Sequence, residues 1–78
     1  MADMLSLKSV LKNNKNVICF DYDEENEVIS FVNKATDMLY QVQVYNNEFY
    51  MVTIMDDCSG DEICVKYFKL HEFKNLKF

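Results

Sequence analysis

The stretch MLYQVQVYNNEFYMVTIM, residues 38–55, decides the fold of this chain. Apolar and polar residues alternate before Asn46 and Asn47, and a second run rich in aromatic and β-branched residues follows them. Two such runs around a short polar pair are typical of antiparallel strands joined by a tight turn. Asn tolerates the positive φ that such a turn requires. The stretch therefore predicts a β-hairpin.

A two-residue turn at Asn46 and Asn47 also fixes which residues face each other across the hairpin. One face is then almost wholly apolar, and we expect it to line the core. Its pairs are Val44 with Phe49, Val42 with Met51, Tyr40 with Thr53 and Met38 with Met55. The other face is a mixture of apolar and polar residues, namely Leu39, Gln41, Gln43 and Tyr45 across from Ile54, Val52, Tyr50 and Glu48.

Shorter patterns on either side of the hairpin complete the fold. The N-terminal segment has apolar residues at helical spacing, and the others alternate with period two between polar turns. We expect a helix at 4–13, strands at 17–23, 28–33 and 63–68, and a loop at 56–61. In the first of these strands Ile18, Phe20 and Tyr22 should share one face. The tail, residues 70–78, is compatible with a helical turn or with irregular chain.

The predicted fold is thus α+β and mostly β. A short N-terminal helix precedes a five-stranded antiparallel meander, which is an open sheet or a small barrel, and a short C-terminal tail or helical turn ends it. This order of elements resembles that of Sm-like barrels. The strands contain no glycine and the chain no arginine, whereas Sm-like domains bend their strands at glycines and bind RNA with an Arg-Gly element. We therefore do not assign the chain to that family.

The length and composition of the chain bound its class. Its 78 residues suit one domain, 1–78, and an apolar content of 50% predicts a packed core. The longest apolar runs are far shorter than a bilayer span, and the N-terminus lacks the features of a signal peptide. We expect a cytoplasmic protein without a membrane partner.

Catalytic and metal-binding motifs are scarce in this sequence. The three cysteines, Cys19, Cys58 and Cys64, form no C-x-x-C pair, and His71 lies outside the usual ligand spacings. We interpret the cysteines as reduced, half-buried apolar residues. Cys64 and His71 are the one conceivable nucleophile and base, but nothing in the pattern brings them together. We expect no enzyme activity, no metal and no cofactor.

Charge is distributed unevenly along the chain. Residues 1–16 carry +2, residues 17–62 carry −10 and residues 63–78 carry +3, for a net charge of −5. The central acids concentrate in two loops. We name the first acidic cluster Asp21, Asp23, Glu24, Glu25 and Glu27, and the second acidic cluster Asp56, Asp57, Asp61 and Glu62. We expect the two clusters to lie at the same end of the sheet and to merge into one negative patch.

A negative patch of this size favours a positively charged protein as its partner. Direct nucleic-acid binding is not expected, because phosphate repulsion opposes stacking on the sheet tyrosines. Tyr45 and Tyr50, on the mixed face of the hairpin, are additional candidates for partner contact. The alternative interpretation of the acidic loops is a solvated surface that aids solubility.

The amino-acid usage adds a hint about origin. Phe, Tyr, Met, Ile, Asn and Lys make 36 residues, whereas Gly, Ala, Arg and Pro make three, which is typical of AT-rich coding. We hypothesise a viral (phage) or mobile-element accessory protein in the host cytoplasm. It would inhibit or modulate a larger host protein of nucleic-acid handling or defence by nucleic-acid mimicry, docking its acidic patch onto a basic groove. The alternative is a structural homo-oligomer, such as a homodimer, held by the mixed hairpin face and by Phe73, Leu76 and Phe78.

Overall fold

The computed structural model describes residues 2–75, which form one short helix, five antiparallel strands and a final 3-10 helix. Each strand pairs with the next in sequence, so the sheet order is β1-β2-β3-β4-β5. Within this described part β1 and β5 are the two edges, and the meander is an open sheet. The elements are α1 (Met4–Lys12), β1 (Val17–Asp23), β2 (Val28–Asn33), β3 (Met38–Val44), β4 (Tyr50–Asp56), β5 (Glu62–Phe68) and η1 (Leu70–Asn75).

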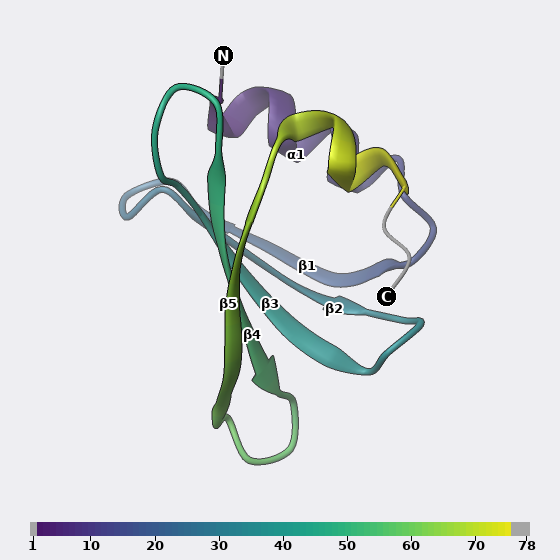
Figure 1. The fold of residues 1–78 in the computed structure, drawn as a ribbon. Coiled ribbons are helices and arrows are strands. Elements are labelled where there is room, and N and C mark those ends of the chain that lie inside the picture. The colour runs from purple at the N-terminus through teal and green to yellow at the C-terminus, as the bar shows by residue number, and fades with distance from the viewer. Residues whose placement is uncertain (1, 76–78) are drawn as a thin grey trace.

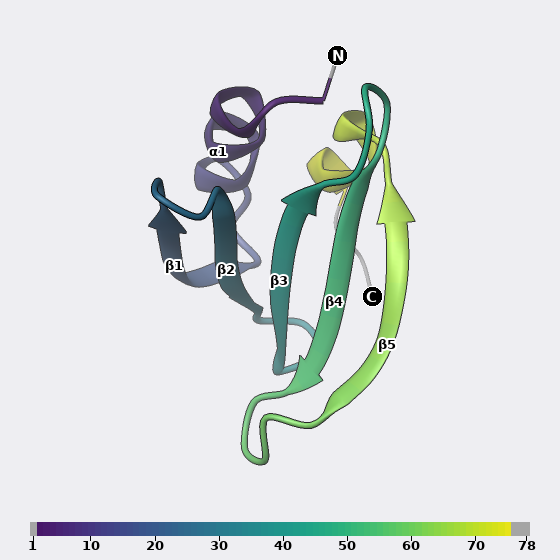
Figure 2. The same cartoon turned by 90° about the vertical axis from the view of Figure 1, so that its left-hand side faces the viewer.

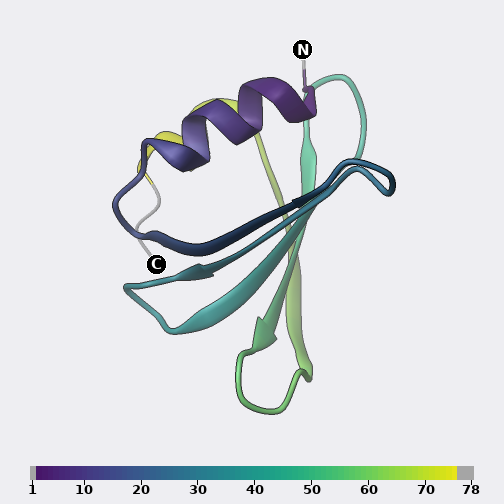
Figure 3. The same ribbon diagram turned by 180° about the vertical axis from the view of Figure 1, so that it is seen from behind.

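The molecule has two layers. The sheet is strongly twisted and curved, and α1 and η1 lie side by side across its concave face (Figure 1). Figure 3 shows the same arrangement from behind, with α1 in front of η1. The core fills the space between the layers and contains Met4, Leu7, Leu11, Ile29, Phe31, Tyr40, Val42, Tyr50, Val52, Ile54, Phe68 and Phe73.

The helix α1 begins at Asp3, whose carboxylate accepts hydrogen bonds from the backbone N–H of Ser6 at 2.8 Å and from its hydroxyl at 3.0 Å. This is a side-chain N-cap, which satisfies amide groups that have no partner inside the helix. Met4, Leu7 and Leu11 are buried, as expected from their spacing. No helix within residues 2–75 has both the length and the apolar character needed to cross a membrane.

Tyr50 connects the start of α1 to the sheet. Its hydroxyl donates to the carbonyl oxygen of Asp3 at 2.6 Å and accepts from the Asp3 N–H at 2.9 Å. Its ring is fully buried in the core. A phenol that both donates and accepts satisfies its own polar atom while its ring fills the core. Tyr50 therefore determines where the helix lies on the sheet.

The hairpin of β3 and β4 exists, but the predicted register is wrong by one residue. Val44 lies opposite Tyr50 rather than Phe49, and Val42 lies opposite Val52 rather than Met51. A shift of one residue moves every side chain of one strand to the other face. Tyr50, Val52 and Ile54 are therefore buried, whereas Phe49, Met51, Thr53 and Met55 are only partly buried.

The loop at Asn46 explains this shift. The Asn46 side-chain oxygen accepts from the N–H groups of Glu48 and Phe49, both at 2.9 Å. The backbone carbonyl of Phe49 in turn accepts from Tyr45 and Asn46 at 3.0 and 3.2 Å. Asn46 thus closes a longer loop by accepting hydrogen bonds with its side chain, in place of the two-residue turn.

The strand β1 also departs from simple alternation. Its pairing with β2 shifts between Ile18 and Asp21, and Cys19 has a φ of 53°. This irregularity is a β-bulge, which adds one residue to the strand and reverses the alternation beyond it. Phe20 and Tyr22 pack against the core as expected, but Ile18 lies on the other face, opposite Val32, and is exposed.

The tail forms the 3-10 helix η1, and Phe73 is buried against the core. Phe73 is therefore not available to bind another copy, as the homo-oligomer interpretation required. Leu76 and Phe78 lie outside the described residues. The interpretation of the cysteines was wrong in part, because Cys19 and Cys58 are exposed and only Cys64 is half-buried.

Candidate functional site

The first acidic cluster lies on the turn between β1 and β2. The Asp23 carboxylate accepts from the N–H groups of Glu25 and Asn26 at 3.1 and 3.2 Å, and from the Asn26 side-chain amide at 2.8 Å. These bonds close the turn locally. All five acids of the cluster are exposed. Asp23 thus shapes the turn, and its neighbours are available for contact.

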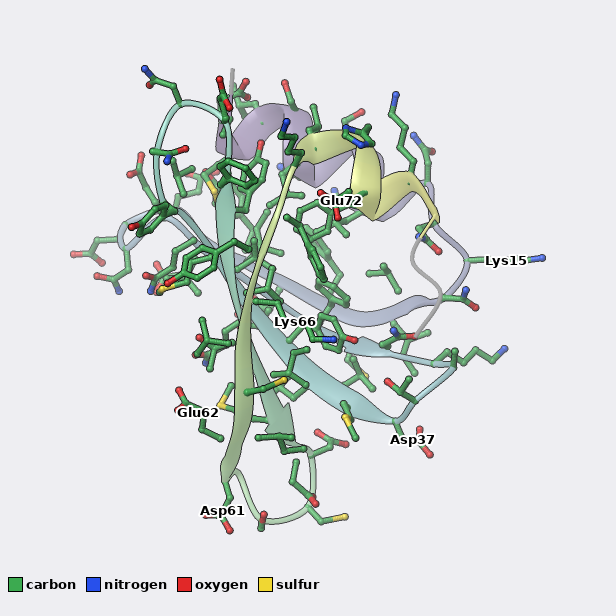
Figure 4. The ribbon with its side chains drawn as sticks, in the orientation of Figure 1. Lys15, Asp37, Asp61, Glu62, Lys66 and Glu72 are labelled. Carbon is green, nitrogen blue, oxygen red and sulfur yellow. The ribbon has the colours of Figure 1, made fainter. Side chains whose placement is uncertain are left out.

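The second acidic cluster lies on the loop between β4 and β5. The Asp56 carboxylate accepts from the N–H groups of Cys58 and Ser59 at 2.8 and 3.3 Å. Gly60 has a φ of +77°, a conformation that side chains rarely adopt, and its N–H donates to the Asp56 carbonyl at 2.8 Å. Asp61 precedes β5 and Glu62 begins it, and both side chains lie at the lower end of this strand (Figure 4).

The expectation that the two clusters merge is wrong. Successive turns of an antiparallel meander alternate between its two ends, so the turns after the first and the fourth strand lie at opposite ends. Figure 2 shows the turn between β1 and β2 at one end of the sheet and the loop between β4 and β5 at the other. The protein has two separate negative ends.

The first acidic cluster instead meets the start of α1. An open depression of about 790 Å³ lies between them, and Asp3, Glu24 and Glu27 are three of the residues that line it. Apolar and aromatic residues complete the lining, namely Ala2, Met4, Leu5, Tyr22 and Val44. We call this hollow the acidic depression.

Of the residues that line the acidic depression, only Glu24 and Glu27 were predicted as site residues, and Ala2, Asp3, Met4, Leu5, Tyr22 and Val44 were not. Asp3 belongs to neither of the two acidic clusters in the sequence. Leu5 is 73% exposed and Val44 is 42% exposed, so both leave apolar surface uncovered beside the carboxylates. The exposure of Leu5 could have been predicted from the sequence. Leu5 is a large apolar residue that falls outside the helical stripe of Met4, Leu7 and Leu11, and therefore on the solvent side of the helix.

Hydrogen bonds favour the charged form of two carboxyl groups at this end, those of Asp3 and Asp23. Hydrogen bonds from Ser6, first of all from its backbone N–H, lower the pKa of Asp3 below its ordinary value of 3.8. Hydrogen bonds from Asn26, first of all from its side chain, lower the pKa of Asp23 in the same way. Such bonds favour the charged form of a carboxyl group.

Replacing Asp3 gives a test of this N-cap. Asp3→Ala should lower the melting temperature, and Asp3→Asn should lower it less, because Asn also caps helices. A carboxyl group with a lowered folded pKa stabilises the fold above its unfolded pKa and ceases to do so as pH falls through its folded pKa. The melting-temperature difference between wild type and Asp3→Asn should therefore shrink below about pH 4. Calorimetry across this range measures it, and a difference independent of pH would contradict the charged cap.

Several lysine side chains lie on the helical layer of the molecule. The Nζ atom of Lys8 lies 5.4 Å from the centre of the Tyr22 ring, and that of Lys12 lies 5.7 Å from the Phe20 ring. A third lysine, Lys69, lies with its Nζ 5.4 Å from the Phe49 ring. Such contacts of cations over aromatic rings are favourable, and they place positive charge along α1 and before η1. In the folded chain these lysines therefore lie on the helical layer, and the two acidic clusters lie at the ends of the sheet.

The two candidate tyrosines have different positions. Tyr45 is 59% exposed and contacts Tyr67 edge to face, with 4.8 Å between ring centroids. These two rings, with Asn46 and Phe49, line a second, largely apolar hollow of about 320 Å³. Tyr50 is fully buried, so its proposed role in partner contact is wrong. Its core position follows from the corrected register of β4.

Metal-binding geometry is not found in the part of the chain that the structure describes, where no three His, Cys, Asp or Glu side chains gather as ligands. His71 lines an open hollow of about 360 Å³ with Lys69, Lys74, Glu48, Ala2 and Leu70. Cys64 is not part of that hollow.

Comparison with family models, with curated proteins and with solved structures finds no match to this chain. The function must therefore be inferred from the residues of the chain itself.

Proposed function

We propose that this protein is a small protein-binding module that docks its acidic depression onto a basic surface of a larger protein. The amino-acid usage is typical of AT-rich coding, and this supports an origin in a virus or mobile element. In that setting the module acts in the host cytoplasm as an inhibitor or modulator of a host protein that handles nucleic acid or serves in defence. Such proteins carry basic grooves, which attract a negative surface.

The observation that carries this proposal is the combination of charge and apolar surface in one hollow. Asp3, Glu24 and Glu27 are three acidic residues of its lining, and Leu5 and Val44, which line the same hollow, leave apolar surface exposed. Lys and Arg side chains have an apolar stem and a cationic head, so both of their parts find a matching surface there. An acidic loop that served only for solubility would not require exposed apolar residues such as Leu5 and Val44 beside it.

Nucleic-acid mimicry adds a second point of contact. The two acidic clusters lie at opposite ends of the sheet and near its opposite edges, so they are separated by at least the length of a seven-residue strand, roughly 23 Å. Seven base pairs of B-DNA rise by about the same distance, so the clusters could meet phosphates at least that far apart. A groove that binds phosphates at two positions therefore meets negative charge at both ends of this module.

The test compares two pairs of charge reversals in the capture of proteins from the natural host. Glu24→Lys with Glu27→Lys changes the acidic depression and leaves the Asp23 turn intact. Asp56→Lys would disturb the loop that Asp56 closes, so the matched pair at the other end is Asp57→Lys with Asp61→Lys. Binding of the captured protein is then measured over a salt series, with circular dichroism as the folding control.

The first pair should weaken binding by about tenfold or more, chiefly through slower association, and added salt should weaken the wild type in the same direction. An equal loss with the second pair supports two-point mimicry, whereas a loss with the first pair alone supports docking through the depression. Undiminished binding by both pairs would sink the proposal.

A further inference from the structure

β1 and β5 form the two edges of the sheet (Figure 2), and these edges differ in their side chains. β1 has a bulge at Cys19 and carries Asp21 and Asp23, which are devices that discourage a further strand from pairing. β5 carries Ile63, Val65 and Tyr67, which are 50%, 40% and 48% exposed. Within the described residues β5 pairs with β4 alone. β5 has a register shift of its own against β4, at Ile63 between Glu62 and Cys64, but from Cys64 to Phe68 its pairing is regular, and this part of the edge presents apolar side chains.

We propose that β5 pairs with β5 of a second copy of this chain, antiparallel and about a two-fold axis at Val65, to form one continuous ten-stranded sheet. Such a contact uses the same surface on both copies and closes at two subunits. It does not depend on docking through the acidic depression, but it uses Asp61 and Glu62 and therefore competes with the two-point mimicry for the second acidic cluster.

The side-chain pattern of β5 selects this register. Centring the pair on Val65 places Val65 opposite its own copy and Ile63 opposite Tyr67 of the second copy. Val65 and Tyr67, opposite Thr53 and Met51, lie on the outer face of the sheet, and Ile63 is the extra residue of the register shift at the start of the strand. Centring the pair on Lys66 would instead bring two lysines directly opposite each other, which is unfavourable. Lys66, opposite the buried Val52, leaves the strand on the inner side, whereas Glu62, opposite Met55, leaves it on the outer side at the start of the apolar row (Figure 4).

Charge complementarity supports the same pairing. An antiparallel arrangement brings the end of β5 in one copy beside the start of β5 in the other. Lys69, which follows β5, then lies next to Asp61 and Glu62 of the second copy, and the symmetry repeats this contact. Lys69, Asp61 and Glu62 are all exposed in the single chain. The acidic loop thus meets the basic start of η1 on both sides of the axis.

The outer face of the pair also continues beyond β5. Tyr67 packs edge to face on Tyr45, and these rings line the apolar hollow with Phe49. Aromatic residues at the margin of a paired strand extend the apolar surface that the two copies share.

Sedimentation equilibrium of the intact protein over a hundredfold range of concentration tests the proposal. Wild type should be a dimer at the upper end of the range. Val65→Lys places two cations on the axis and should raise the dimer dissociation constant at least about tenfold. The matched control is Ile18→Lys, since Ile18 is 38% exposed on the outer face of the other edge strand and should leave dimerisation unchanged.

A charge exchange keeps the test independent of any loss of folding. Lys69→Glu and Asp61→Lys should each weaken the dimer, and the double variant should restore it to within a few-fold of wild type. A wild-type protein that stays monomeric, a dimer indifferent to Val65→Lys, or a double variant as weak as the single ones would overturn the proposal. A monomer that binds an extended peptide along β5 would count against it in the same way.

Discussion

Val52→Asp is expected to abolish folding. Val52 is fully buried at the centre of β4, opposite Val42 on the next strand. A carboxylate there loses its hydration, which costs several kcal/mol, and Lys66, opposite Val52 on β5, is exposed and so offsets little of that cost. A domain of this size has a total stability of about 4 to 12 kcal/mol. The measurement is far-ultraviolet circular dichroism together with the dispersion of amide resonances, both of which should report an unfolded chain.

The control for this prediction is the adjacent residue. Met51 lies on the outer face of β4 and is only partly buried, so Met51→Asp should remain folded. A two-residue turn at Asn46 and Asn47 requires the reverse, with Met51 inside and Val52 outside. An unfolded Met51→Asp beside a folded Val52→Asp would therefore restore that register.

The elements themselves could be predicted from the sequence, whereas the register of β4 could not. Alternation and polar turns gave the bounds of the first two strands, Val17–Asp23 and Val28–Asn33, as the structure has them. In β4, however, both faces are rich in apolar residues: Met51 and Met55 are on one, and Val52 and Ile54 on the other. Periodicity cannot choose between two faces of similar hydropathy. The hydrogen bonds of the Asn46 side chain determine which face of β4 is buried, and the β-bulge in β1 determines on which face Ile18 lies.

The candidate site was predictable only in part. Glu24 and Glu27 were recognised from their local density of charge, and both line the acidic depression. Asp3 joins them because Tyr50, 47 residues away, holds the start of α1 against β4. Contacts of such separation in sequence leave no local pattern. The separation of the two acidic clusters, by contrast, follows from the alternation of turns in a meander and needs no coordinates.

Phe73→Ala is expected to have the second large effect. Phe73 is fully buried, and its ring lies edge to face with Tyr50 and with Phe68, at 5.5 Å between centroids in both cases. Its carbonyl accepts from the Asn14 side-chain amide at 3.1 Å, which ties η1 to the end of α1. Removing a buried phenylalanine costs about 3 to 5 kcal/mol, because apolar contact is lost and a cavity remains.

A loss of that size removes a large share of the stability of a 78-residue domain. It corresponds to a fall in melting temperature of at least about 12 °C. Phe49→Ala is the matched control, since Phe49 is only partly buried beside Lys69 and should cost much less. Thermal and urea denaturation of both variants measure the difference. If the free energy of unfolding of Phe73→Ala lay within about 1 kcal/mol of the wild-type value, η1 would contribute little to the core, and α1 alone would cover the concave face of the sheet.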